Sequence, residues 1–249
     1  MRVGGEPIFV KLPDNFELDV ESVKKAVTAD TRIVSICNPH SPSGTLYSKE
    51  TVLDLVEFCR KKNAIVSVDE NYIEFAEKGQ DNTMAGYAKK YENLFVIRSV
   101  TKFYGMPGIR LGYGIATESL IDTLQTVRQP WSINSLGGYA TLAAFRDTEF
   151  IENTKRTIAK ERVRFAEMLN ETGGLHVFPS VTNFLLVKIL LKKVTATILK
   201  EELAKEGILI RDCGTFMGLD DRYFRVTVRS FEENFVLVKA LKKALKIAY

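Results

Sequence analysis

Short runs of β-branched residues alternate with amphipathic helical patterns along the first half of the chain. The segments predicted there are strands at residues 8–11, 32–36, 64–68, 94–97 and 111–116, and helices at residues 19–28 and 48–62. Ser48 stands at the N-cap position of the second helix, ahead of the apolar positions Val52 and Leu55. This β-α-β alternation predicts an α/β fold with a mainly parallel sheet, in which ligands bind beyond the carboxyl ends of the strands.

The pattern changes after residue 133, where a long helical region begins. The segments predicted there are helices at residues 134–169 with a break near 146–148, 195–205 and 232–247, and strands at 175–178, 184–189, 208–210 and 224–228. We therefore expect a large domain over residues 1–149 and a smaller C-terminal α+β domain over residues 150–249, joined by a long helix.

Composition and charge exclude several classes of protein. The chain has 249 residues, of which 45% are hydrophobic and 27% charged, as is typical of a folded domain. Its net charge of +4 is too small and too evenly spread to indicate a nucleic acid or membrane partner. Three separated cysteines and two histidines indicate neither a disulfide framework nor a metal site. Because we find no signal peptide and no apolar run of roughly 18 residues, we expect a cytoplasmic protein.

Unusual polar sequences follow three of the predicted strands. They are a loop rich in Pro and Gly at residues 37–44, the pair Asp69 and Tyr72, and the group Ser99, Lys102 and Arg110. Since the carboxyl ends of parallel strands meet at one edge of a sheet, we expect these groups to surround one crevice.

This set of side chains suits one cofactor. A lysine amine can form a Schiff base with an aldehyde, and an aspartate carboxylate can keep a pyridine nitrogen protonated. A serine hydroxyl and an arginine fork can hold a phosphate monoester. The cofactor that needs all three is pyridoxal phosphate.

Four blocks across residues 38–113 resemble the class I/II aminotransferase family of fold type I. They are Asn38-Pro39-x-x-Pro42-x-Gly44, Asp69-x-x-Tyr72, Ser99-x-x-Lys102 and Pro107-Gly108-x-Arg110-x-Gly112-Tyr113. Their common order and spacing make the resemblance far more specific than any single block. It implies the fold of pyridoxal-phosphate-dependent transferases.

The resemblance also implies roles around the cofactor ring. Lys102 would bind the cofactor aldehyde, and Asp69 would pair with the pyridinium nitrogen. Asn38 and Tyr72 would form hydrogen bonds with the ring hydroxyl. These assignments make Lys102, Asp69 and Tyr72 the expected catalytic residues.

For the cofactor phosphate, the resemblance implies Ser99 and Arg110 as ligands. His40 and Ser41 stand where the family usually carries Asn-Asn or similar residues. We interpret this difference as a loop variation.

The second half of the chain resembles the branch of the family that contains L-threonine-O-3-phosphate decarboxylases, which belong to cobalamin biosynthesis. The segments concerned are residues 129–134, 178–186, 207–213 and 222–229. By this resemblance, Arg211 and Arg225 contact a small phosphorylated amino acid, together with Asn38. Strand alternation independently places Arg225 and Arg229 on one face, and two guanidinium forks suit a substrate with a carboxylate and a phosphate.

Three functional hypotheses remain open at this point. The first is a decarboxylase of a phosphorylated amino acid, and the second is an aminotransferase related to the histidinol-phosphate enzymes. The third is an inactive fragment, because family members carry a further segment before the position that matches Met1. A mis-assigned start codon would instead restore the full enzyme. The family resemblance also implies a homodimer.

Overall fold

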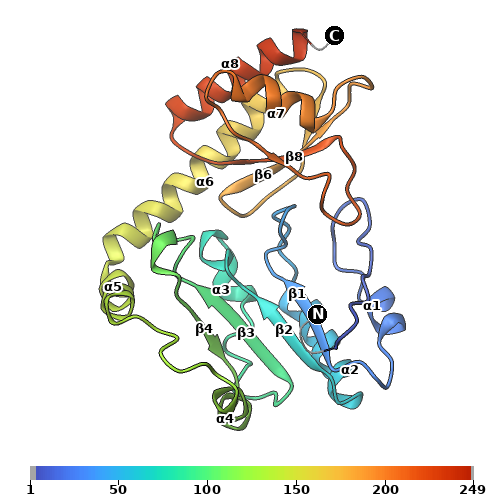
Figure 1. Cartoon of the computed structure of the whole chain (residues 1–249), viewed down its shortest axis with the longest axis vertical. Helices are drawn as coiled ribbons and strands as arrows, with labels where there is room; N and C mark the ends of the chain where they lie inside the picture. The colour runs from blue at the N-terminus through green and yellow to red at the C-terminus, as the bar shows by residue number, and fades with distance from the viewer. Residues whose placement is uncertain (1–3, 248–249) are drawn as a thin grey trace.

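Helices and strands alternate along the part of the chain that the computed structural model describes, residues 4–247 (Figure 1). The first elements are α1 (Val20–Ala26), β1 (Ile33–Cys37), α2 (Lys49–Lys61), β2 (Ile65–Asp69), the 3-10 helix η1 (Ile73–Phe75), α3 (Gly79–Asn82), β3 (Leu94–Ser99), the 3-10 helix η2 (Pro107–Ile109), β4 (Gly112–Ile115) and α4 (Glu118–Thr126). The elements that follow are α5 (Ser135–Arg146), α6 (Thr148–Asn170), β5 (Leu175–Val177), β6 (Phe184–Ile189), α7 (Ala196–Ala204), β7 (Arg211–Asp212), β8 (Tyr223–Thr227) and α8 (Phe231–Ile247).

The first sheet has four strands in the order β1-β2-β3-β4. β1, β2 and β3 are parallel, whereas β4 runs antiparallel to β3 because a short connection without a crossover helix joins the two. α2 buries Leu55 and Cys59 against one face of the sheet, where they meet Val66, Val68 and Val96. The predicted α/β fold with a mainly parallel sheet is therefore confirmed.

Side-chain caps begin several helices at the positions expected from the sequence. The Ser48 hydroxyl accepts a hydrogen bond from the Thr51 N–H at 3.1 Å, and the Asp19 carboxylate accepts one from the Ser22 N–H at 3.0 Å. Asp147 accepts from the Phe150 N–H at 2.9 Å and separates α5 from α6, at the predicted break. Each such cap typically stabilises a helix by about 1 kcal/mol.

Two strand predictions are wrong and two helices were missed. Residues 8–11 form no strand, and Ile8 and Phe9 are 65% and 64% exposed, since no neighbouring strand of the described chain pairs with them. Residues 208–210 are also irregular, and the strand there is instead Arg211–Asp212, where backbone pairing with β8 begins. The helices α3 and α4 were not predicted from the sequence.

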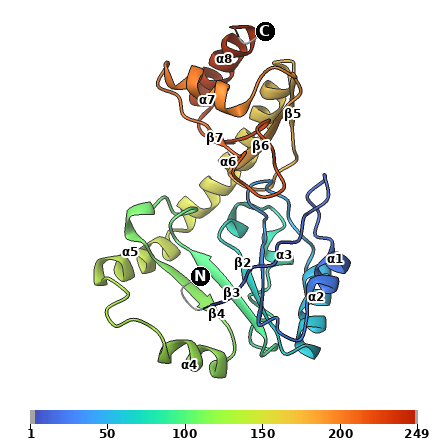
Figure 2. The ribbon, with the colours of Figure 1, turned by 45° about the vertical axis from the view of Figure 1, so that its right-hand side comes forward.

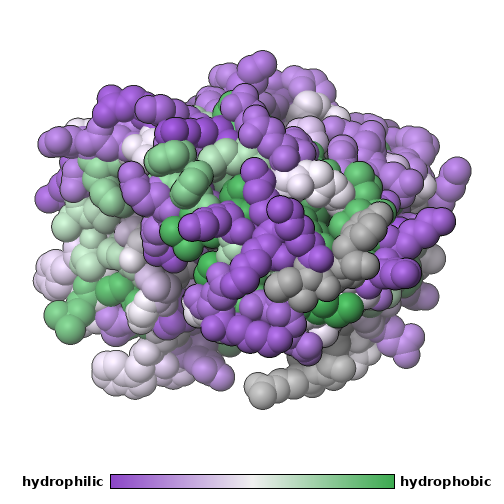
Figure 3. Space-filling model, turned by 90° about the horizontal axis from the view of Figure 1, so that it is seen from above, coloured by the Kyte–Doolittle hydropathy of each residue, from purple (hydrophilic) through white to green (hydrophobic). Residues whose placement is uncertain are grey.

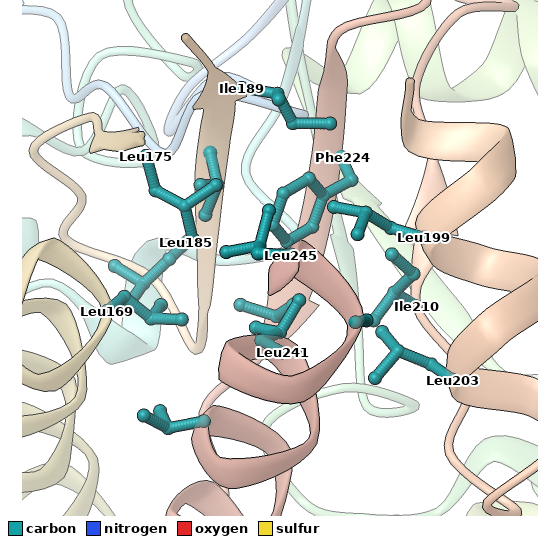
Figure 4. Close-up of a cluster of buried hydrophobic side chains, with 14 of the residues drawn as sticks. Leu169, Leu175, Leu185, Ile189, Leu199, Leu203, Ile210, Phe224, Leu241 and Leu245 are labelled. Atoms are coloured by element: carbon teal, nitrogen blue, oxygen red, sulfur yellow. The ribbon is translucent and has the colours of Figure 1, made fainter. Parts of the chain in front are cut away.

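The second sheet is antiparallel throughout, in the order β5-β6-β8-β7. α6, α7 and α8 contribute to its core, and Figure 4 shows Leu241 of α8, Leu185 of β6 and Phe224 of β8 within the same cluster. Figures 1 and 2 both show this sheet above the first one, with α6 running between the two parts.

The surface differs from one side of the molecule to the other. Figure 3 looks down from above and shows mostly hydrophilic side chains, with apolar ones gathered toward the left, the side on which Figure 1 places α5. Leu136, Tyr139 and Leu142 of α5 are 82%, 76% and 54% exposed. Within residues 4–247, every helix is too short or too polar to cross a membrane.

Candidate active site

The loop after β1 is fixed to the neighbouring strand and to its own far end. The Asn38 backbone N–H donates to the Asp69 carbonyl oxygen at 2.8 Å. Its buried side-chain amide donates to the Tyr47 carbonyl oxygen at 3.2 Å and accepts from the Tyr47 N–H at 2.8 Å. Asn38 therefore lies at the carboxyl edge of the sheet, directly beside the last residue of β2.

Asp69 ends β2 and stands opposite Cys37 in the register of the parallel pair. Its Oδ1 accepts a hydrogen bond from the Asn71 N–H at 2.9 Å, which fixes the carboxylate at the start of the following turn. Burial, together with the Asp69 charge, raises the pKa of the Cys37 thiol to about 12. Cys37 is therefore a neutral thiol at physiological pH and supplies no nucleophile.

Tyr72 connects this edge to the second sheet. Its ring meets the Phe184 ring edge-on at 5.0 Å, and the Arg225 guanidinium lies 4.7 Å from the centre of the same Phe184 ring. Burial raises the pKa of Tyr72, and the nearby Arg225 charge opposes this rise. Arg225 Nη1 also donates to the Ser41 hydroxyl at 2.9 Å, so the loop after β1 holds this arginine.

Arg211 and Arg225 are direct cross-strand partners in the β7–β8 pair. Residues paired in this way lie on the same face of a sheet, where like charges repel. Arg211 is exposed, with its guanidinium 5.5 Å from the Phe216 ring centre. An anion bound between the two guanidinium groups would relieve their repulsion. Arg229 differs, because it forms an ion pair with Glu233 at 2.7 Å.

Ser99, Lys102 and Arg110 all lie at the β3–β4 connection. The Ser99 hydroxyl accepts from the Thr101 N–H at 3.0 Å, and the Lys102 side chain is exposed in the loop that follows. Arg110 has a left-handed backbone with φ of +52°, and its guanidinium donates to the Pro107 carbonyl oxygen at 3.1 Å. These three residues lie on one continuous segment of the chain, but the Arg110 side chain contacts Pro107 rather than Ser99.

The loop at residues 38–45 packs directly against the second part of the chain. Gly44 has φ of +81°, and a Cβ there would lie 2.1 Å from the Ser180 hydroxyl oxygen, so only glycine fits. The Gly44 carbonyl accepts from the Val181 N–H at 3.0 Å. His40 lies between the Phe16 and Tyr47 rings and contacts the Ser43 hydroxyl at 2.8 Å through Nδ1.

Comparison with known proteins identifies the family of the chain. The family described as Aminotransferase class I and II matches residues 2–241. The chain belongs to this family.

Three relatives illustrate the similarity within the aminotransferase family. A provisionally named threonine-phosphate decarboxylase of Caldanaerobacter subterraneus is 38% identical over 96% of this chain and 65% of its own length. The crystal structure of the histidinol-phosphate aminotransferase from Clostridium acetobutylicum has a TM-score of 0.90 and 34% identity, over 96% of this chain and 71% of that one. A histidinol-phosphate aminotransferase structure from Sinorhizobium meliloti, in complex with pyridoxal-5'-phosphate, has a TM-score of 0.87 and 25% identity, over 99% and 66%.

These comparisons establish the fold and the extent of the match. The chain has the fold type I architecture of pyridoxal-phosphate-dependent enzymes. It spans less than two thirds of the length of the Caldanaerobacter relative.

Sequence analysis missed several residues that shape this site. Ser41 contacts Arg225 and Phe184 lies between Tyr72 and Arg225, but neither was among the predicted site residues. Glu70 and Arg98 form a buried ion pair behind Asp69 and Ser99. The only sequence signal for this pair is that opposite charges stand at the carboxyl ends of two adjacent strands, Glu70 just after β2 and Arg98 within β3.

The buried His40 ring makes folding stability depend on pH. Burial lowers the folded-state pKa of His40 to about 4, whereas an unfolded histidine titrates near 6.5. The unfolded chain therefore binds more protons between these values, and stability falls as the pH drops from about 6.5 to about 4. The unfolding free energy of the wild-type protein should fall between pH 7 and pH 5, and in His40→Asn this fall should be smaller by about 2 kcal/mol. Urea denaturation at the two pH values measures it.

His176, which is exposed, supplies the matched control. His176→Asn should leave the wild-type pH dependence in place. An unchanged pH dependence in His40→Asn would show that burial does not shift this histidine.

Proposed function

We propose that this chain carries the pyridoxal phosphate site of an enzyme acting on a small phosphorylated amino acid or amine. The observation that carries the proposal is that Asn38, Asp69 and Tyr72 all lie at the carboxyl edge of the sheet, where the Asn38 backbone N–H bonds the Asp69 carbonyl oxygen, with Lys102 in the loop after β3. Family membership and a relative's complex with pyridoxal phosphate support it.

The donor set fits this cofactor. In the proposal, the Asp69 carboxylate holds the protonated pyridine nitrogen, and Tyr72 forms a hydrogen bond with the ring hydroxyl. The Asn38 amide is buried and already bonds the N–H and the carbonyl oxygen of Tyr47, so it has one N–H left for the same hydroxyl. The Lys102 amine is the group that would bind the aldehyde, because it is exposed in the loop that follows β3. When bound, pyridoxal phosphate supplies an electron sink for bonds at the α-carbon of an amino acid.

Ser99 and Arg110 are the proposed ligands of the cofactor phosphate. The Ser99 hydroxyl lies at the carboxyl end of β3. Arg110 meets the phosphate only if its guanidinium leaves the Pro107 carbonyl oxygen that it now contacts. A phosphate offers a bidentate, charge-assisted partner, which is stronger than one neutral carbonyl.

Arg211 and Arg225 are the proposed substrate ligands, together with Asn38. Their guanidinium groups share one face of the second sheet, and Arg225 lies beside Tyr72. Two such forks suit a substrate that carries both a carboxylate and a phosphate. This positive pair supports a phosphorylated amino acid over a neutral one.

The reaction that we favour is decarboxylation, as in an L-threonine-O-3-phosphate decarboxylase of cobalamin biosynthesis. The bond between the α-carbon and the carboxylate breaks, carbon dioxide leaves, and the α-carbon gains a proton from Lys102. The 38% identity to a threonine-phosphate decarboxylase supports this reading. The alternative is transamination, supported by the TM-score of 0.90 to a histidinol-phosphate aminotransferase; Lys102 would then move the α-proton instead.

We also propose how the chain is organised and assembled. Residues 1–149 form the cofactor domain and residues 150–249 the smaller domain, in a cytoplasmic homodimer. The exposed apolar side chains of α5, among them Leu136 and Tyr139, support an interface on that side.

Lys102 provides the direct test of cofactor binding. Adding pyridoxal phosphate to the purified protein should produce an absorbance band near the edge of the visible range, because the lysine amine condenses with the aldehyde. Lys102→Ala should abolish the band, and Lys192→Ala, which changes an exposed lysine in another part of the fold, should retain it. A band of wild-type strength in Lys102→Ala would contradict the assignment, and no band in the wild type would support the inert alternative.

The substrate test separates the two reactions. With O-phosphothreonine we expect carbon dioxide release without a keto acid. Turnover only of histidinol phosphate, and only with 2-oxoglutarate, would contradict the decarboxylase proposal. Arg211→Gln should raise the KM for O-phosphothreonine by about tenfold or more, because it removes a charged hydrogen-bond donor. Arg229→Gln is the control and should leave KM near the wild-type value.

A further inference from the structure

A buried ion pair lies behind the proposed cofactor site. The Glu70 side chain is 0% exposed and that of Arg98 is 12% exposed. Glu70 Oε2 accepts hydrogen bonds from Arg98 Nε at 3.1 Å and from Arg98 Nη2 at 2.8 Å. One carboxylate oxygen thus receives two donors from the same guanidinium.

Neighbouring groups complete the network around this pair. The Thr83 hydroxyl donates to Glu70 Oε2 at 2.6 Å and accepts from Arg98 Nη2 at 2.6 Å. The Met84 N–H donates to Glu70 Oε1 at 2.6 Å. Arg98 also faces Glu74, with Nη1 and Oε1 3.7 Å apart. Both Glu70 oxygens are therefore satisfied, so the carboxylate is held in one orientation.

The position of the pair along the strands connects it to the site. Glu70 directly follows Asp69, the last residue of β2, and its N–H continues the ladder to the Ile97 carbonyl oxygen, whereas Arg98 directly precedes Ser99 on β3. In the parallel register Asp69 stands opposite Ile97, so Asp69 and Ser99 share one face of the sheet. Glu70 and Arg98 share the other face. Each partner of the ion pair is thus covalently next to one proposed cofactor ligand.

The two ligands contact opposite ends of the proposed cofactor. Asp69 would hold the ring nitrogen, and Ser99 would hold the phosphate. A rigid ligand that engages both ends is bound well only if their separation is fixed before binding. A buried ion pair adds little to stability compared with apolar packing, so its presence here suggests a geometric role.

We propose that Glu70 and Arg98 are positioning residues that set the separation between Asp69 and Ser99. This inference rests on the proposed function, since it concerns binding of the same cofactor. The pair acts through the backbone of β2 and β3 and does not touch the cofactor.

Two ligands distinguish positioning from general destabilisation. Pyridoxal phosphate engages both ends of the site, whereas pyridoxal lacks the phosphate and engages only the ring end. Glu70→Gln should weaken equilibrium binding of pyridoxal phosphate by about tenfold and that of pyridoxal by less than twofold. The dissociation constant of pyridoxal divided by that of pyridoxal phosphate should therefore fall by about five- to tenfold. Both constants are measured by absorbance titration on protein shown to be folded by circular dichroism.

Matched variants make the result specific. Arg162→Gln breaks another ion pair of a buried arginine, with Glu77, and should leave the ratio unchanged. Arg98→Lys keeps the charge but removes the planar guanidinium with its two adjacent donors. It should give a ratio between those of the wild type and Glu70→Gln. If Glu70→Gln does not fold, Thr83→Val removes one hydroxyl from the network and should still lower the ratio two- to threefold.

Each outcome decides between the proposals. A wild-type ratio in folded Glu70→Gln or Thr83→Val, with tight binding by the wild-type protein, would overturn the positioning role and leave the proposed function standing. Equal weakening of both ligands would overturn it as well. Absence of pyridoxal phosphate binding by the wild-type protein would overturn the proposed function, and the positioning role with it.

Discussion

Parallel pairing of β1, β2 and β3 is the constraint on which the proposed site depends. The register places Cys37 opposite Asp69 and Asp69 opposite Ile97, so the three strands end nearly level. The hydrogen-bond ladder continues one residue further, from the Asn38 N–H to the Asp69 carbonyl and from the Glu70 N–H to the Ile97 carbonyl. Polar side chains that are far apart in sequence therefore emerge at one edge.

Contacts between the two parts of the chain bring Arg225, a proposed substrate ligand, to that edge. The loop after β1 reaches across, so that Ser41 accepts from Arg225 and Gly44 packs on Ser180. Arg225 is thereby held by a residue only three positions from Asn38. Any ligand that bridges the sheet edge and Arg225 would contact both parts of the fold. The position of the proposed cofactor would then affect how the substrate is bound.

Sequence patterns predicted the elements whose neighbours are close in sequence. They failed where an element or a contact depends on which strands pair and in which register. The β-α-β alternation located β1, β2 and β3, and the Asp147 break was confirmed. Residues 8–11 have a strand-like pattern, yet a strand also needs a partner, which the described chain does not supply. The pairing of Arg211 with Arg225 depends on the β7–β8 register, and that of Glu70 with Arg98 on the β2–β3 register. Neither register can be read from single residues.

The central claim is that the level strand ends form a cofactor site. Amide hydrogen exchange measured by mass spectrometry, with and without pyridoxal phosphate, tests it most directly. We predict slower exchange with the cofactor at residues 37–41, 69–73 and 98–103, and unchanged exchange in β5 and in the outer turns of α8. Equal exchange at the three strand ends in both samples, or protection confined to other segments, would contradict the account.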